Sequence, residues 1–319
     1  MKIIDEIKKR ASKVKATIIV PEANIDKRVY DACKSILDNK ISKLIVFGKE
    51  DEFDDSFKTK NCQIIDIAEF KDLNKFASDL YELRKAKGMT LDKANELVRR
   101  ADYFSMMLLK EGLADGVVAG ATWSTADTLR PALQVIKTKK DKPIVTGITL
   151  MVKENADPKV FADVSLIENP TSENLADIAI SGAEFIEKVL KLEPKVAMLS
   201  YSTKGSAKSE MVDKVRIATE LANKKSNYLI DGEMQVDSAL DKPTAIKKGV
   251  TSKVGGEANV LVFPDLNAGN IGYKLVARMG GYTAIGPIML NFNKPVNDLS
   301  RGSNVEEIIN TICITKLLV

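Results

Sequence analysis

Histidine is absent from all 319 residues of the chain. Its absence excludes Ser-His-Asp and Cys-His nucleophile arrangements, HExxH zinc sites and a histidine general base. Proton transfer must therefore fall to a carboxylate, a lysine, a tyrosine or a cysteine. No Asp-x-Asp-x-Asp run or close cluster of carboxylates in the sequence suggests a dedicated metal site.

Cysteines and long apolar runs are scarce. Cys33, Cys62 and Cys313 lie far apart without CxxC spacing, so we expect buried or free thiols, as is usual in the cytoplasm. No apolar run approaches the roughly 20 residues that cross a bilayer. The amino-terminal MKIIDEIKKRASK is typical of an amphipathic helix rather than a signal peptide. We therefore expect a soluble, cytoplasmic protein.

Positive and negative charges nearly balance, with 48 basic and 44 acidic residues and a net charge of +4. That excess is too small for a nucleic-acid footprint, so a small anionic ligand is the better expectation, with neither nucleic acid nor membrane as partner. The chain is longer than one core comfortably supports, and 45% hydrophobic residues suffice for two domains.

Strand and helix patterns alternate from Ala16 onward, which indicates βαβ units and parallel sheets. Two helices, 74–87 and 90–100, are expected on either side of Gly88, with Thr90 as N-cap. The segment ATWSTADTLRPALQVIK should open a helix at Ser124 or Thr125 that Pro131 kinks or interrupts. A charged stretch at 139–143 is the first plausible linker.

The stretch from Asn259 to Asp265 is a short apolar run, as expected of a buried parallel strand. We expect turn residues at 266–269 before a helix begins. Ligands bind beyond the carboxyl ends of such strands, so Asp265, Asn267 and Asn270 are placed to line a crevice.

A short polar segment, Ser300-Arg301-Gly302, precedes a predicted carboxyl-terminal helix at 304–317. The pattern SNVE at 303–306 predicts a capping box, which gives Glu306 a structural task and leaves Glu307 without one. From the residues alone, Glu307 fits an exposed first-turn acid that the helix dipole stabilises.

The segment KVAMLSYSTKGSAKSE, at 195–210, runs from a strand through hydroxyl-rich residues into a helix. Backbone and hydroxyl donors at a helix N-terminus form a candidate anion site, and Lys204 is either a counter-charge or solvated. An ordinary capped loop is the plainer alternative. The GxxxxGK[ST] spacing is missing, which argues against nucleotide hydrolysis.

Three motifs together carry a family resemblance: TADTLRPALQ, FPDLNAGNIGYKLVAR and AIGPIMLNFNKPVNDLSRG. With their order and spacing, the chain resembles the phosphate acetyltransferases (phosphotransacetylases), a family that also includes phosphate butyryltransferases. The resemblance implies two α/β/α domains with largely parallel sheets flanking an interdomain cleft, similar to the isocitrate/isopropylmalate dehydrogenase-like fold. The first domain would comprise residues 1–141 plus 291–319, and the second residues 142–290.

The resemblance also implies reversible transfer of an acetyl group between acetyl-CoA and phosphate, by direct thiolate attack in a ternary complex. Ser300, Arg301 and Glu307 match the family's catalytic centre, although the family commonly has Asp at the last position. Coenzyme A would be a substrate, with no tightly bound cofactor, and the protein a homodimer of acetate metabolism. Nine residues are expected to bind substrates: Arg84, Arg130, Arg278, Ser200, Ser202, Thr203, Lys204, Gly205 and Asn267.

Other functions are also compatible with the sequence. Phosphate butyryltransferase chemistry would use the same scaffold. An oxidoreductase is disfavoured because a GxGxxG motif and metal-binding acids are missing. A non-catalytic sensor would bind acyl phosphate or coenzyme A without turnover. Trp123 stands where relatives usually place a smaller or polar residue, and it either packs under a loop or narrows the pocket.

Overall fold

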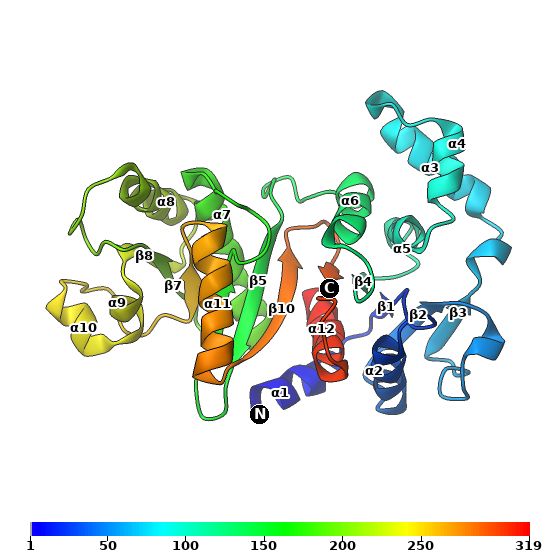
Figure 1. Ribbon diagram of the computed structural model, residues 1–319, viewed down its shortest axis with the longest axis horizontal. Coiled ribbons are helices and arrows are strands. Elements are labelled where there is room, and N and C mark those ends of the chain that lie inside the picture. Colours follow the sequence, from blue (N-terminus) through cyan, green and yellow to red (C-terminus); the bar gives the residue numbers. More distant parts are fainter. Residues whose placement is uncertain (1) are drawn as a thin grey trace. The chain divides into compact units, whose positions relative to one another are not determined.

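The computed structural model describes residues 2–319 (Figure 1). The chain folds into two compact units. The first, called here the terminal unit, contains Ile4–Lys140 and Phe292–Val319. The second, the central unit, contains Asp141–Asn291 together with the first residues of the chain up to Ile3. Each unit is an α/β fold built on one main sheet, as the alternating pattern predicts.

The sheet of the terminal unit has five strands in the order β11-β4-β1-β2-β3. Every neighbouring pair is parallel. The strands are β1 (Thr17–Ile19), β2 (Lys43–Phe47), β3 (Cys62–Ile65), β4 (Gly116–Ala119) and β11 (Val296–Asp298). Because they are parallel, the carboxyl ends of β11, β4 and β1 lie next to one another at one edge.

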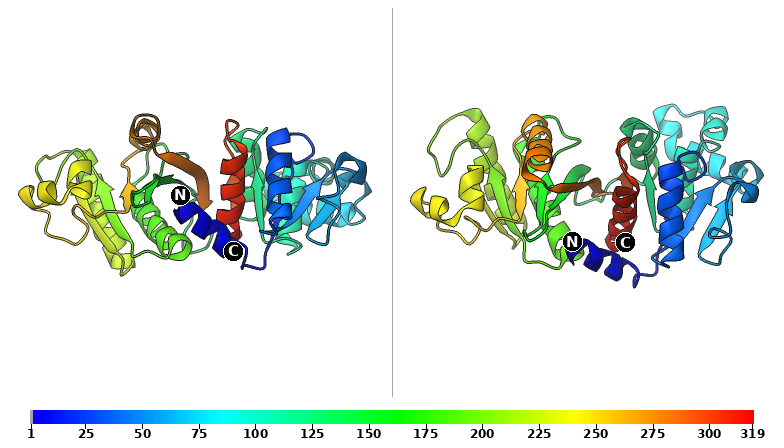
Figure 2. Two further views of the ribbon diagram at one scale, coloured as in Figure 1. Left: turned by 90° about the horizontal axis from the view of Figure 1, so that it is seen from below. Right: turned by 60° about the horizontal axis from the view of Figure 1, so that its bottom comes forward.

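Helices cover this sheet, and α12 packs against α2, β1 and β4 (Figure 2). A cluster of aromatic rings, with Phe47 and Phe104 5.2 Å apart, fills the core beside β2. The α-helices are α1 (Lys2–Ala11), α2 (Lys27–Asp38), α3 (Leu73–Arg84), α4 (Leu91–Leu97), α5 (Ala101–Lys110), α6 (Thr125–Val135) and α12 (Val305–Leu318). Three single-turn 3-10 helices are η1 (Glu50–Glu52), η2 (Ile67–Glu69) and η3 (Lys85–Lys87).

Several predicted helix boundaries in the terminal unit are confirmed. Gly88 ends η3 in the left-handed conformation, and the Thr90 hydroxyl accepts a hydrogen bond from the backbone N–H of Lys93 at 3.2 Å. Ser124 caps α6 as expected. The interruption at Pro131 is not observed, since α6 continues to Val135. The fixed φ of proline suits a helix, so the main loss is one backbone hydrogen bond.

The sheet of the central unit has six strands in the order β10-β5-β6-β9-β7-β8. The strands β6, β9, β7 and β8 are parallel to one another, but β5 pairs antiparallel with both β6 and β10. The strands are β5 (Thr146–Val152), β6 (Lys159–Ala162), β7 (Lys195–Leu199), β8 (Leu229–Met234), β9 (Val260–Val262) and β10 (Thr283–Leu290). The sheet is therefore mixed at one side and parallel elsewhere.

The α-helices of the central unit are α7 (Ser172–Phe185), α8 (Glu210–Lys225), α9 (Val236–Leu240), α10 (Lys242–Lys247) and α11 (Leu266–Gly280). A π-helical turn, η4 (Ile186–Leu190), extends α7. The turn expected at 266–269 is wrong, because those residues form the first turn of α11. Asp265 is its N-cap, and its carboxylate accepts a hydrogen bond from the backbone N–H of Ala268 at 2.9 Å.

Within residues 2–319, no helix is both long enough and apolar enough to span a bilayer. All three cysteines are free: Cys33 and Cys313 are buried, and Cys62 is partly exposed. Burial raises the pKa of Cys62 and of Cys313 to about 12, so neither thiol is activated as a nucleophile.

Candidate active site

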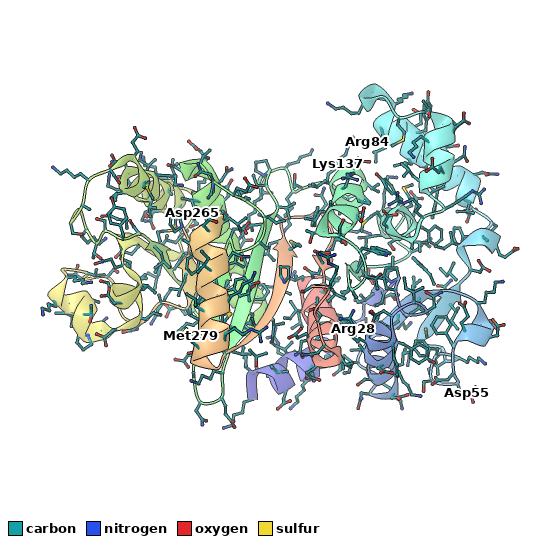
Figure 3. The ribbon with its side chains drawn as sticks, in the orientation of Figure 1. Arg28, Asp55, Arg84, Lys137, Asp265 and Met279 are labelled. Atoms are coloured by element: carbon teal, nitrogen blue, oxygen red, sulfur yellow. The ribbon has the colours of Figure 1, made fainter. Side chains whose placement is uncertain are left out.

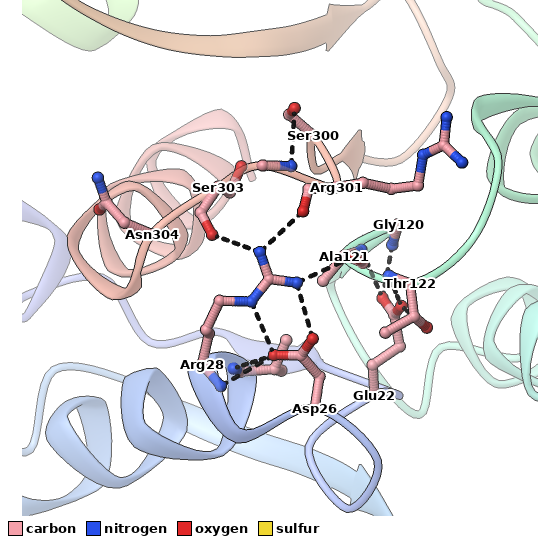
Figure 4. A network of polar contacts seen from close by, with 12 residues as sticks. Glu22, Asp26, Arg28, Gly120, Ala121, Thr122, Ser300, Arg301, Ser303 and Asn304 are labelled. Carbon is pink, nitrogen blue, oxygen red and sulfur yellow. Dashed lines mark hydrogen bonds and ion pairs between the residues drawn. The ribbon is translucent and has the colours of Figure 1, made fainter.

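Polar residues follow each of the three neighbouring strands whose carboxyl ends meet in the terminal unit. Glu22 follows β1, the segment Gly120–Thr122 follows β4, and Ser300 follows β11. This edge of a parallel sheet is where ligands bind in open α/β folds. The three loops are close enough to share the hydrogen-bond network drawn in Figure 4.

Glu22 is fully buried and holds the loop after β4. Its carboxylate accepts hydrogen bonds from the backbone N–H groups of Gly120, Ala121 and Thr122 at 2.6, 3.1 and 2.6 Å. The Thr122 hydroxyl donates a fourth bond at 2.6 Å. Four donors offset the cost of burying the charge, so the loop is fixed by a carboxylate from a different strand. Glu22 was not predicted as a site residue, although an acid shortly after a buried strand stands where ligands bind in such folds.

Ser300 and Arg301 lie on a tight turn between β11 and α12. The backbone N–H of Ser303 donates to the carbonyl of Ser300 at 2.9 Å. The backbone N–H of Gly302 donates to the Ser300 hydroxyl oxygen at 3.2 Å, so that hydroxyl keeps its own proton free to donate. The exposed Arg301 side chain points away from the turn (Figure 4). One turn beyond β11 therefore carries both a hydroxyl donor and an arginine side chain.

The predicted capping box is wrong by one residue. Asn304, not Ser303, is the N-cap of α12, and its side chain accepts from the backbone N–H of Glu307 at 2.9 Å. The Glu307 carboxylate accepts in return from the backbone N–H of Asn304 at 3.2 Å. Asn and Ser are equally good N-caps, so the pattern alone did not fix the frame. Glu307 thus has a structural task, whereas Glu306 pairs with Lys8 at 2.5 Å.

Asp298, at the end of β11, is a buried carboxyl group that sequence analysis did not single out. It is 2% exposed, and within the described part of the chain its Oδ1 atom has no hydrogen-bond partner. Burial raises its pKa to about 6, the charge of Glu22 adds to the rise, and the nearby hydroxyls of Thr125 and Thr128 limit it. A Cβ at Gly120 would lie 2.2 Å from this oxygen, so only glycine fits opposite Asp298.

Arg84 and Arg130, both predicted to bind substrate, line one pocket of about 420 Å³ in the terminal unit. We call it the basic pocket. Its wall contains five basic side chains but only two acids, Asp102 and Asp127. The Nε atom of Arg84 is buried and has no hydrogen-bond partner among residues 2–319. The five basic residues are Arg84, Lys87, Lys93, Arg100 and Arg130.

The acids of the basic pocket are already engaged. Arg100 makes two hydrogen bonds to Asp102, at 2.7 and 3.2 Å. Asp127 belongs to the capping box with Ser124, whose hydroxyl, with Arg100 and Arg130 nearby, lowers the pKa of the Asp127 carboxyl. A polyanion entering the pocket would therefore meet the free guanidinium groups of Arg84 and Arg130.

Trp123 is half-buried and lines a second hollow of about 290 Å³. That hollow shares Arg100, Asp102 and Asp127 with the basic pocket. The indole is therefore a wall residue near the basic pocket, and its effect on acyl-chain preference stays a prediction.

The predicted anion loop at 200–206 lies in the central unit between β7 and α8, with Ser202 and Thr203 buried. Two of its donors, the Ser202 hydroxyl and the Gly205 N–H, reach one oxygen of the buried Glu233 carboxylate, at 3.0 and 2.7 Å. Lys204 forms an ion pair with Asp231. These donors thus hold carboxylates of the chain itself, as the capped-loop alternative describes.

The other members of this loop have internal partners as well. The Ser200 hydroxyl accepts from the backbone N–H of Ser202 at 3.2 Å, and the Thr203 hydroxyl donates to Gln235 at 3.3 Å. The Ser200 hydroxyl keeps its own proton to donate, whereas an anion bound by the other groups would have to replace one of their contacts; the substrate role of the loop stays a prediction.

Asn267 and Arg278, also predicted to bind substrate, stand near opposite ends of α11 in the central unit. Figure 3 labels Asp265 and Met279 beside them at the two helix ends. Both residues are exposed. At 1.5 Å per residue they are about 16 Å apart along the axis, so they cannot bind the same small group.

Comparisons with known proteins bear on the whole chain. The family model described as phosphate acetyl/butaryl transferase matches residues 2–316. A phosphate acetyltransferase from Clostridium acetobutylicum is 45% identical over 99% of this chain and 98% of its own length. The crystal structure of a phosphotransacetylase from Streptococcus pyogenes superposes with a TM-score of 0.92 at 42% identity, covering 99% of this chain and 97% of that one.

A structure with much lower sequence identity shares the fold. A putative 4-hydroxythreonine-4-phosphate dehydrogenase from Salmonella typhimurium aligns over 96% of this chain and 100% of its own, with a TM-score of 0.55 at 11% identity. The predicted likeness to a dehydrogenase-type fold is confirmed, and this similarity concerns the fold alone.

Proposed function

Because the chain belongs to the phosphate acetyl/butaryl transferase family, we propose that it transfers an acetyl group reversibly between acetyl-CoA and phosphate. The observation that carries the proposal is the turn beyond β11, which carries both the Ser300 hydroxyl and the Arg301 side chain at the carboxyl edge of a parallel sheet. Relatives at 40–45% identity over nearly the whole chain are named phosphate acetyltransferases.

Coenzyme A binds in the basic pocket. Its 3′-phosphate and pyrophosphate carry several negative charges, and five cations line the pocket. Arg100 is paired with Asp102 and Lys93 with Glu96, so Arg84, Lys87 and Arg130 are the cations without an ion pair among residues 2–319. The buried, unpartnered Nε of Arg84 is a donor that a phosphate oxygen would satisfy. Arg130, on α6, supplies a second bidentate donor.

The reaction is a direct displacement. The coenzyme A thiolate forms a C–S bond with the acetyl carbon while the C–O bond to phosphate breaks, and phosphate leaves with the electron pair. Arg301 binds the phosphoryl group, and the Ser300 O–H donates a hydrogen bond, without losing its proton, to the negative charge that develops on the carbonyl oxygen. No acyl-enzyme is formed, and no proton needs to pass through a histidine.

Glu307 accepts the thiol proton. A thiol at a pKa of about 8.5 and a glutamate near 4.3 differ by about 4 units, or roughly 6 kcal/mol for complete transfer. Arg301 reduces that cost by stabilising a thiolate with positive charge, whereas the amino end of the α12 dipole stabilises the thiolate and the Glu307 carboxylate alike. The Glu307 carboxylate must give up its 3.2 Å cap contact with the Asn304 N–H to reach the thiol.

Acetyl transfer is favoured over butyryl transfer, because the relatives that match nearly the full length are named as acetyltransferases. An oxidoreductase is supported only by the 11% likeness to a putative dehydrogenase, which concerns the fold. A sensor without turnover would not need a Ser300 hydroxyl with a free proton beside Arg301.

A homodimer forms through α11 in the central unit. Ile271, Leu275 and Met279 recur every four residues along that helix and are 57%, 52% and 83% exposed. An uncharged apolar stripe of this kind is self-complementary in a two-fold pair, and covering it removes apolar area from water. The three free thiols favour a reducing compartment, which supports the cytoplasm as location.

Thioester formation from coenzyme A and acetyl phosphate tests this function. The wild-type protein should form acetyl-CoA and release phosphate, and butyryl phosphate should react more slowly. Exchange of labelled phosphate into acetyl phosphate should require coenzyme A. Exchange without coenzyme A would indicate an acyl-enzyme, and binding of both substrates without product would leave only the sensor.

A further inference from the structure

Arg28 joins the two loops of the candidate site although sequence analysis gave it no role. It lies at the start of α2, and its NH1 group donates to the carbonyls of Arg301 and Ser303, both at 2.8 Å. Its NH2 group donates to the carbonyl of Ala121 at 3.2 Å. One guanidinium therefore binds two carbonyls of the Ser300–Ser303 turn and one of the loop after β4 (Figure 4).

Asp26 holds the guanidinium in this orientation. It accepts from Nε of Arg28 at 3.1 Å and from NH2 at 2.7 Å, and its side chain also caps α2. The ion pair lowers the pKa of the Asp26 carboxyl and raises the pKa of Arg28. The N-cap residue of α2 therefore fixes the orientation of the Arg28 guanidinium.

All five N–H groups of Arg28 are engaged. An arginine has one donor on Nε and two on each terminal nitrogen, and the structure supplies five contacts in that distribution. No donor remains for a phosphate or an acyl group. The Arg301 side chain extends from the turn on the side away from Arg28 (Figure 4).

We infer that Arg28 is a positioning residue for acyl transfer: it clamps the turn that carries Ser300 and Arg301 to the loop after β4. The inference rests on the proposed function. Because both carbonyls it binds belong to the four-residue turn, losing them lets the turn move relative to that loop. Errors of about 1 Å in catalytic placement can lower a rate about a hundredfold.

The clamp should affect kcat rather than binding of coenzyme A. The loop after β4 keeps its four hydrogen bonds to Glu22 when Arg28 is removed, so α6 and the basic pocket stay in place. A lysine at position 28 has a single ammonium that cannot reproduce the planar fork, so it should replace only part of the function.

Arg28→Ala, Arg28→Lys and the control Lys27→Ala would be compared with the wild type in kcat, in KM for both substrates and in melting temperature. Lys27 is the neighbouring cation, and its 84% exposed side chain pairs only with Asp31 among the residues that the structure describes. We expect kcat of Arg28→Ala to fall about 10- to 100-fold with KM for coenzyme A unchanged. Arg28→Lys should be intermediate, and Lys27→Ala should match the wild type.

Added guanidinium ion at low millimolar concentration should restore part of the kcat of Arg28→Ala and leave Arg28→Lys unaffected. A purely structural loss would lower the melting temperature without this rescue. If Arg28→Ala does not fold, Asp26→Asn serves instead. It keeps an oxygen to cap α2 but removes the ion pair, so kcat should fall several-fold with KM unchanged.

The possible results distinguish failure of the proposed function from failure of the Arg28 clamp. A wild type that forms no acetyl-CoA rejects the proposed function. An active wild type with an unchanged kcat in Arg28→Ala rejects the clamp and leaves the function standing. A raised KM for acetyl phosphate at constant kcat would also overturn the clamp, because it would make Arg28 a substrate ligand.

Discussion

Replacing Asp298 by asparagine should stabilise the protein more at neutral pH than in acid. Asp298 is 2% exposed with one unpartnered oxygen, and its pKa is about 6 instead of the ordinary 3.8. Because the folded pKa lies above the unfolded one, the folded protein favours the protonated acid. The stability that this group supplies is complete below pH 3.8 and is lost as the pH rises through about 6.

The magnitude follows from the two pKa values. A difference of about two pH units corresponds to about 3 kcal/mol between the extremes of pH. Asparagine has nearly the same shape and no charge to bury, so it does not lose this stability. Between about pH 4.5 and pH 7.5, the free energy of unfolding of Asp298→Asn relative to the wild type should therefore increase by about 2 kcal/mol.

Urea unfolding at these two pH values, followed by circular dichroism, measures the difference. Asp51→Asn is the matched control, because that carboxylate lies in the same unit and is exposed. It should show no such increase. A gain for Asp298→Asn that is equal at both pH values, or larger in acid, would refute the assignment of a buried, proton-linked carboxyl group at the end of β11.

Three further predictions concern the site and the assembly. Arg84→Ala should raise KM for coenzyme A at least about tenfold, because a charged hydrogen bond contributes about 1.5–3 kcal/mol. Its KM for acetyl phosphate should not change, and the control Lys85→Ala should have the wild-type KM for coenzyme A. Steady-state kinetics measures these constants. Glu307→Gln should lower kcat about a hundredfold or more with little change in KM, and an unaffected kcat would remove Glu307 as the base. Glutamine still accepts from the Asn304 N–H, so its melting temperature should be nearly constant. Met279→Glu should convert a dimer of about twice 35.0 kDa into monomers in analytical ultracentrifugation, and a wild-type monomer would contradict the α11 interface.

Most of the architecture followed from local patterns. Alternating apolar runs gave the strands and helices, and single residues such as Thr90 and Ser124 marked helix starts correctly. Strand direction is not encoded in the apolar period, so the antiparallel pairing of β5 was not foreseen. The three-residue strand β11 was missed because it lies inside a stretch rich in polar residues.

The site was predictable only where a motif or a family resemblance pointed to it. Ser300, Arg301, Arg84 and Arg130 were predicted from the sequence. In the structure, Arg84 and Arg130 line one pocket. Glu22, Arg28 and Asp298 were not, because their roles depend on burial and on partners far away in the sequence. Arg28 contacts residues 273 and 275 positions away, and no local period carries that information.

Acyl transfer at the turn beyond β11 is the main proposal, and Arg301 on that turn gives the clearest test of it. The most direct measurement is the rate of acetyl-CoA formation by Arg301→Ala, with Arg99→Ala, an exposed arginine outside the basic pocket, as control. We predict a loss of about a hundredfold or more in kcat/KM for acetyl phosphate with unchanged binding of coenzyme A. A variant that forms acetyl-CoA at the wild-type rate would contradict the account.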